Sequence, residues 1–160
     1  MRIFFPKGLR AGTRIFRRFS AFKTFGGPVK HERQIIFFDG VCNLCNGFVD
    51  FLLRWDSEHL FDFAPLQGAS ARQMLPARIP AELNSVVLWS QGELHEKSDA
   101  ALMVLQQLGG IWWATKIFWV LPKGVRDWFY DRVAKNRYAL FGKRETCRLP
   151  TADERARFLD

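Results

Sequence analysis

The stretch from Gln34 to Trp55, QIIFFDGVCNLCNGFVDFLLRW, constrains the fold of this chain more than any other part of it. It begins with four apolar residues that predict a buried strand, and Asp39-Gly40 predicts the turn that ends the strand. Two cysteines follow, Cys42 and Cys45. From there the apolar residues recur at the spacing of one helix face: Leu44, Phe48, Leu52 and Trp55. The stretch therefore predicts a strand, a tight turn, a C-x-x-C motif and a helix.

A dithiol at the start of a helix favours thiol–disulfide chemistry. The reactive form of cysteine is the thiolate, and a helix N-terminus favours an anion because its first N–H groups are unpaired. Cys42 would lie at this end and is the candidate nucleophile, whereas Cys45, one turn later, is placed to resolve a mixed disulfide. The spacing thus predicts a reversible disulfide between these two residues.

Asp39 is the third candidate catalytic residue. Its carboxylate opposes a nearby thiolate by about 3 kcal/mol, if the charges lie ~5 Å apart at an effective dielectric constant of ~20. The helix terminus contributes roughly 0.3–2 kcal/mol in the opposite direction. Two roles stay open for Asp39: a general base that takes the proton of Cys45, or a turn and capping residue.

A zinc site is the alternative for the same cysteines. Cys147, far along the chain, could join Cys42 and Cys45 as a ligand, with His95 or Asp39 as the fourth. Cys147 could equally be a third redox residue or an inert thiol. In the alternative, the chain is a non-catalytic module that binds zinc or a membrane surface; in the favoured interpretation it needs no metal and no cofactor.

Composition restricts the compartment and the partners. The chain has 160 residues and three cysteines, too few for a disulfide framework, which favours a reducing, cytoplasmic location. No apolar run reaches the ~18 residues that a membrane-spanning helix needs. The net charge is +8, and residues 1–30 contain eight of the 24 basic residues and no acidic one.

We expect residues 1–33 to form a basic, aromatic leader that is poorly ordered, and residues 34–160 to form the folded domain. Residues 1–30 could instead contact an anionic membrane peripherally or bind nucleic acid without sequence specificity. No specific nucleic-acid partner is expected; the expected partner is a thiol or disulfide substrate.

The remaining pattern predicts an α/β domain. Residues 61–65 and 85–90 read as strands, and Gln91-Gly92 turns the second of them into a hairpin with residues 93–97. Helices are predicted at 66–75, after an N-cap at Ser98, and after Pro122. Two proline residues, Pro76 and Pro80, bracket a predicted loop. The order is βαβαββα, with a first crossover long enough for parallel pairing.

Residues 111–121 are apolar and aromatic, and we expect them to pack on the sheet rather than on a membrane. In the helix after Pro122 an apolar stripe is predicted from its spacing: Val125, Trp128, Phe129, Val133 and Tyr138.

The chain resembles the DCC family, which is named for the Asp-x-x-Cys-x-x-Cys triplet found here at Asp39, Cys42 and Cys45. The resemblance extends over residues 34–160. It includes APLQ at 64–67, KSDAAL at 97–102 and KNRYALFGKRETCRLP at 135–150. It implies a thioredoxin-like fold with additional C-terminal helices, and thiol–disulfide oxidoreductase activity.

Two features depart from thioredoxin-like enzymes. Those enzymes have a cis-proline before the first strand of the hairpin, where this chain has Asn84-Ser85. The dipeptide inside the motif is Asn43-Leu44 rather than Gly-Pro, so the redox potential of thioredoxin does not transfer to this chain.

Overall fold

The computed structural model describes residues 33–82, 85–147 and 150–159. The leader predicted over residues 1–33 lies outside the described residues, apart from its last residue. The elements in chain order, with η for a 3-10 helix, are β1 (Gln34–Phe38), α1 (Asn43–Trp55), β2 (Phe61–Pro65), α2 (Ala69–Met74), α3 (Arg78–Glu82), β3 (Val87–Ser90), β4 (Glu93–Glu96), α4 (Lys97–Gln107), η1 (Gly110–Val120), α5 (Lys123–Phe141) and η2 (Arg155–Arg157).

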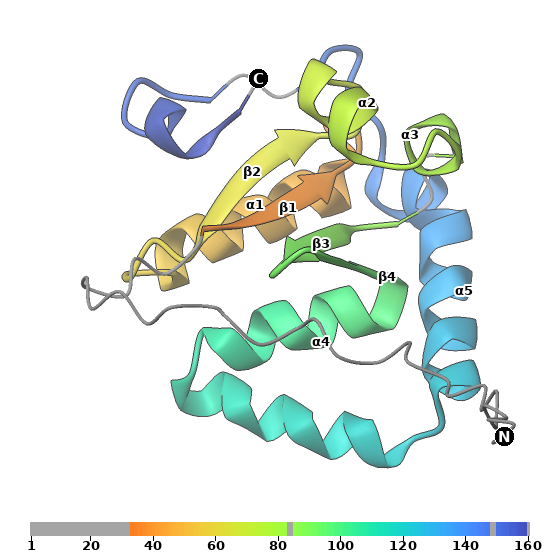
Figure 1. Cartoon of the computed structure of the whole chain (residues 1–160). Helices are drawn as coiled ribbons and strands as arrows, with labels where there is room; N and C mark the ends of the chain where they lie inside the picture. The colour runs from red at the N-terminus through yellow and green to blue at the C-terminus, as the bar shows by residue number, and fades with distance from the viewer. Residues whose placement is uncertain (1–32, 83–84, 148–149, 160) are drawn as a thin grey trace, which may run out of the picture. The chain divides into compact units, whose positions relative to one another are not determined.

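Four strands form one mixed sheet in the order β2-β1-β3-β4 (Figure 1). Strand β1 is parallel to β2 and antiparallel to β3, which pairs with β4 as a hairpin. Helix α1 makes the crossover between the parallel strands. The hairpin turns at Gln91-Gly92, whose φ angles of 51° and 82° are those that a tight hairpin turn requires. The predicted thioredoxin-like α/β fold with additional C-terminal helices is confirmed.

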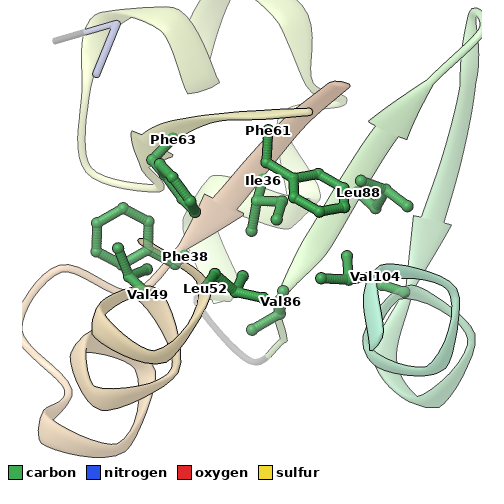
Figure 2. Packing of buried hydrophobic residues seen from close by; sticks show 10 residues of the cluster. Ile36, Phe38, Val49, Leu52, Phe61, Phe63, Val86, Leu88 and Val104 are labelled. Atoms are coloured by element: carbon green, nitrogen blue, oxygen red, sulfur yellow. The ribbon is translucent and has the colours of Figure 1, made fainter. Parts of the chain in front are cut away.

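The sheet is buried on both faces, which explains why β1 is apolar throughout instead of alternating. Ile36 and Phe38 point to one face, where they pack against α1 and α4 (Figure 2). Phe37 lies between them in sequence and therefore points to the opposite face, where it packs with residues of α2 and α3. Because β1 contributes to both clusters, its carboxyl end, where the dithiol follows, is held from both sides.

The C-terminal segment closes the outer edge of β2. The guanidinium of Arg157 forms an ion pair with the buried carboxylate of Asp56, the C-cap of α1, and donates to the carbonyl of Phe61. Two residues after Arg157, the N–H of Leu159 donates to the carbonyl of Phe63 at 3.0 Å. The C-terminal segment thereby covers the outer edge of β2, whose N–H and C=O groups would otherwise lack a neighbouring strand on that side.

Three predictions next to the sheet are wrong in detail. The helix predicted at 66–75 exists only as α2, and the predicted loop between the prolines contains a short helix, α3, in which Pro80 occupies the tolerated first turn. The N-cap of α4 is Glu96, whereas Ser98 lies inside the helix and donates its hydroxyl to Asp127 at 2.5 Å.

The expected packing of residues 111–121 on the sheet is wrong. They form η1, which runs back alongside α4 (Figure 1), and none of its residues is buried. Ile111 is 76% exposed and Val120 is 83% exposed. One face of the sheet is already filled by α1 and α4, and the other by residues of α2 and α3.

Helix α5 does not bury the face that was predicted to be buried. The predicted apolar stripe is largely exposed, and the only buried residues of the helix are Arg126 and Arg137. Arg126 donates to Asp99 of α4 at 2.8 Å, and Tyr130 accepts the N–H of Val86 at 2.9 Å. Hydrogen bonds and ion pairs therefore attach α5 to the domain, in place of the apolar face that its spacing predicted.

Within the part of the chain that the structure describes, no helix has both the length and the apolar character needed to cross a bilayer.

Candidate functional site

The end of β1 positions the dithiol. The strand stops at Phe38, and the chain turns so that the N–H of Cys42 donates to the carbonyl of Asp39 at 3.2 Å. Cys42 has an extended backbone (φ −85°, ψ 123°) and is the N-cap of α1, and its own carbonyl accepts the N–H of Asn46. The prediction that the C-x-x-C motif opens the helix is therefore confirmed in its geometry.

The two thiols differ in exposure. Cys42 is fully buried, with 0% of its surface exposed, whereas Cys45 is partly exposed. Both are free thiols in this structure, and they lie close to each other. Burial raises the pKa of Cys45 to about 12, and the neighbouring Cys42 and the carboxylate of Asp39 add to the effect. Cys45 is thus held protonated at neutral pH.

Asp39 is buried, and hydrogen-bond donors surround its carboxylate. One oxygen accepts the N–H of Val41 at 3.1 Å and the amide of Gln67 at 2.7 Å. The other accepts the guanidinium of Arg137 at 3.0 Å and the hydroxyl of Tyr138. A carboxylate offers about four lone-pair sites, and four donors fill them here.

Arg137 and Tyr138 are the site residues that sequence reasoning missed. They come from α5, almost one hundred positions after Asp39, and no local spacing connects them. One signal was present, because both residues lie inside the KNRYALFGKRETCRLP stretch that carried the family resemblance.

The loop after α5 covers the N-terminus of α1. The N–H of Arg144 donates to the carbonyl of Val41 at 2.8 Å, and Lys143 pairs with Cys42 as an isolated β-bridge. The N–H of Asn43, the first of the helix, donates to the carbonyl of Gly142 at 3.4 Å. This loop explains why Cys42 is buried although it lies at a helix end.

Cys147 lies beside the turn that precedes the motif. A Cβ added to Gly40 would stand only 2.1 Å from the sulfur of Cys147, so this glycine provides the room for that side chain. His95 lies elsewhere, on β4 opposite Leu88. Among the described residues, no three His, Cys, Asp or Glu side chains cluster closely enough to hold a metal ion, so the zinc alternative has no ligand set there.

A cavity of about 200 Å³ opens next to Cys45. Apart from Cys45, its wall is mostly apolar. It is lined by Leu44, Phe48, Val86, Ala101, Val133 and Ala134, with Asp39, Ser85, Tyr130 and Arg137 as the polar members. Cys42 and Cys147 do not line it. The cavity therefore offers access to one sulfur of the pair.

Comparison with known proteins identifies the family of this chain. A sequence model of a family described as DCC1-like thiol-disulfide oxidoreductase matches residues 36–143, which is more than half of the chain. The chain belongs to this family. Among relatives, it is 40% identical over 128 residues to "Uncharacterized protein YuxK" of Bacillus subtilis, covering 79% of this chain and 93% of that protein. It is 37% identical over 121 residues to "DCC family protein At1g52590, chloroplastic" of Arabidopsis thaliana, covering 74% of this chain and 70% of that protein. No solved structure matches the chain.

The DCC1-like match includes the strand, the motif and α5. Asp39, Cys42, Cys45 and Arg137 all fall within residues 36–143, whereas Cys147 lies beyond them. The dithiol, Asp39 and Arg137 thus lie in the part of the chain that matches the DCC1-like family.

Proposed function

We propose that this chain is a thiol–disulfide oxidoreductase that carries two electrons on Cys42 and Cys45. The observation that carries the proposal is the closeness of two free thiols, Cys42 and Cys45, at the start of α1, where Cys42 is the N-cap. Two neighbouring thiols of this kind can close into an intramolecular disulfide. The substrate is a thiol or a disulfide, and the scarcity of cysteines favours a reducing compartment such as the cytoplasm.

The reaction moves two electrons. When a substrate disulfide is reduced, one thiolate of the pair attacks a substrate sulfur and the first substrate thiol leaves; the second cysteine then attacks the mixed disulfide and the second substrate thiol leaves. The dithiol becomes the Cys42–Cys45 disulfide, and its two protons end on the two product thiols.

Asp39 belongs to the proposed site in one of two roles. Through Arg137 and Tyr138 it holds α5 beside Cys45. To serve as the general base for Cys45 it has to release one of its four donors, because they occupy the lone pairs that would take the proton.

A redox titration tests the proposal. Thiol counts across a glutathione series should show one two-electron transition, which is lost in Cys42→Ser and in Cys45→Ser. Cys147→Ser is the matched control and should retain the transition. A transition that survives in Cys42→Ser but disappears in Cys147→Ser would show that the pair has been assigned wrongly.

We also propose a second function, peripheral contact with an anionic membrane. Segment 110–141 exposes four basic residues, Lys116, Lys123, Arg132 and Lys135, and its η1 portion exposes two tryptophans, Trp113 and Trp119. Exposed aromatic side chains next to cations are typical of segments that lie at a bilayer surface. The basic residues 1–30, which lie outside the described residues, would add to the attraction.

Sedimentation with vesicles tests this second function. The full chain should bind vesicles that contain phosphatidylglycerol and not those of phosphatidylcholine alone. Trp113→Ser combined with Ile117→Ser should weaken binding several-fold, whereas Leu140→Ser, an exposed apolar residue near the other end of α5, should not. Equal vesicle binding by the η1 double variant and by Leu140→Ser would show that η1 does not contact the membrane. Self-association of the protein in place of vesicle binding would show that a second copy of the chain covers the exposed face of η1.

A further inference from the structure

The burial of Cys42 separates the two sulfurs of the proposed redox pair. Its surface is 0% exposed, and the loop after α5 lies over it through the backbone pairing with Lys143. A substrate sulfur therefore has no approach to Cys42 in this structure. Cys45 is partly exposed and lines the cavity, so the open path to the pair ends at its sulfur.

The size of the cavity limits what can accompany the substrate sulfur. Its volume is about 200 Å³. A dry cavity of about 150 Å³ lined by Leu, Ile and Phe is large enough to bind benzene, whereas drug-sized ligands occupy roughly 300–1,000 Å³. The space beside Cys45 therefore suits one ring or one branched alkyl group. Val133, which is 47% exposed, shows that the cavity reaches the surface.

The charge of the cavity limits the substrate further. Its two ionic side chains, Asp39 and Arg137, form an ion pair with each other at 3.0 Å, so neither offers an unbalanced charge to a ligand. Tyr130 adds no charge, because burial raises its pKa to about 12 and keeps the phenol protonated. An anionic group would lose its hydration in this cavity and gain no counter-charge in return.

From this geometry we propose that Cys45, and not Cys42, is the sulfur that exchanges with the substrate, and that the substrate is a small thiol or disulfide with an uncharged apolar group next to its sulfur. The proposal rests on the oxidoreductase function proposed above and names its substrate class. It reverses the order of attack that the position of Cys42 at the helix start predicted.

The oxidised protein reacts with such a thiol in two balanced steps. The substrate thiolate attacks the sulfur of Cys45, a new S–S bond forms, the Cys42–Cys45 bond breaks, and Cys42 leaves as a thiolate at the N-terminus of α1. A second substrate thiol then attacks the first substrate sulfur, and Cys45 leaves. Two substrate thiols become one disulfide, and their two electrons and two protons remain on the two cysteines.

The environment of Cys45 favours this direction. Because burial, together with Cys42, raises the pKa of Cys45 to about 12, the reduced protein has almost no Cys45 thiolate at neutral pH. Attack by Cys45 on a disulfide is therefore slow there. Attack on the oxidised protein uses the substrate's own thiolate and is free of this restriction.

The first experiment locates the mixed disulfide. Oxidised wild-type protein is mixed with benzyl mercaptan, quenched in acid and alkylated, and fragmentation mass spectrometry assigns the adduct. We expect at least tenfold more adduct on Cys45 than on Cys42. An adduct mainly on Cys42 overturns the inference.

The second experiment tests the substrate class. Rates of reaction of the oxidised protein with benzyl mercaptan and with glutathione are each divided by the rate of the same thiol with the urea-unfolded oxidised protein. We expect the normalised rate of benzyl mercaptan to exceed that of glutathione by about tenfold, because apolar contacts in a pocket usually provide discrimination of this size. Ala134→Phe, which fills the cavity, should abolish the preference, whereas Ala139→Phe, exposed on the same helix, should preserve it.

Each outcome decides a separate point. Equal normalised rates for the two thiols, or a preference that survives in a folded Ala134→Phe protein, overturn the substrate class. If Ala134→Phe does not fold, Ala101→Leu fills the same cavity from α4 and replaces it. If the redox titration shows no two-electron transition at all, the oxidoreductase function itself fails. If the transition is present but the adduct forms on Cys42, the function stands and only the assignment of Cys45 fails.

Discussion

Replacing Asp39 by asparagine separates its two candidate roles. The carboxylate and Arg137 form a buried ion pair, with 2% and 7% of their side-chain surfaces exposed. At a charge separation of ~4 Å and an effective dielectric constant of ~20 the attraction is about 4 kcal/mol, and a buried charge left without its partner costs about 3–5 kcal/mol. We therefore expect Asp39→Asn to lower the free energy of unfolding by about 3–5 kcal/mol. In a domain of this size that corresponds to roughly 10–20 °C in Tm.

The assay combines a thermal melt with stopped-flow measurement of mixed-disulfide formation and resolution. If Asp39 acts mainly through Arg137, Asp39→Asn shows the large loss of stability, and the step in which the Cys45 thiol attacks slows by less than tenfold. The control is Asp62→Asn, whose partner Arg33 is largely exposed, so the same substitution should cost less than about 1 kcal/mol. A rate of attack by the Cys45 thiol lowered by about 10²-fold or more, with Tm within a few degrees of wild type, would refute the structural reasoning and establish Asp39 as the general base.

Three further outcomes are expected. Arg157→Leu should lower the free energy of unfolding in urea by about 3–5 kcal/mol, because the buried carboxylate of Asp56 loses its partner; an unchanged midpoint would show that the C-terminal segment is not needed to close the edge of β2. Gly40→Ala should destabilise the protein by about 1–3 kcal/mol, because the new methyl would overlap the sulfur of Cys147, and adding Cys147→Ala should restore most of the loss. Because burial raises the pKa of Tyr130 to about 12, its phenol ionises in the unfolded chain first; stability should therefore fall between about pH 10 and pH 12, and urea titrations should show a smaller fall in Tyr130→Phe.

The sequence was sufficient for the dithiol and its strand because the determining information is local. Four consecutive apolar residues, a turn dipeptide and the change to helical spacing all lie within Gln34–Trp55, and the structure has β1, the turn and α1 at those positions. The phase of α1 was less well predicted. Leu52 is buried as expected, but Trp55 is 54% exposed, and Asn46 and Val49 are buried beside Leu52. Leu44 and Phe48 line the cavity next to Cys45, and Phe48 also packs against the core cluster.

The residues that surround the dithiol could not be predicted from spacing, since they come from α5. Apolar periodicity identifies a buried face only when apolar packing attaches the helix, and α5 is attached through Arg126 and Arg137. The contacts of Asp39 with Arg137 and Tyr138 span 98 and 99 positions, so no window of local sequence contains both partners. The burial of Cys42 escaped prediction for the same reason, because a distant loop covers it.

The way α5 is attached has a consequence for local unfolding. A helix whose buried residues are two arginines would uncover little apolar surface on leaving the domain. Since both the denaturant dependence and the heat capacity of an opening scale with newly exposed surface, detachment of α5 should have a small m-value and a small ΔCp. The amide hydrogens of α5 should then exchange with solvent through a local opening that is almost insensitive to low denaturant. Those of β1 should exchange only through global unfolding. Because the chain beyond α5 covers Cys42, the same opening would set how often the buried sulfur meets solvent.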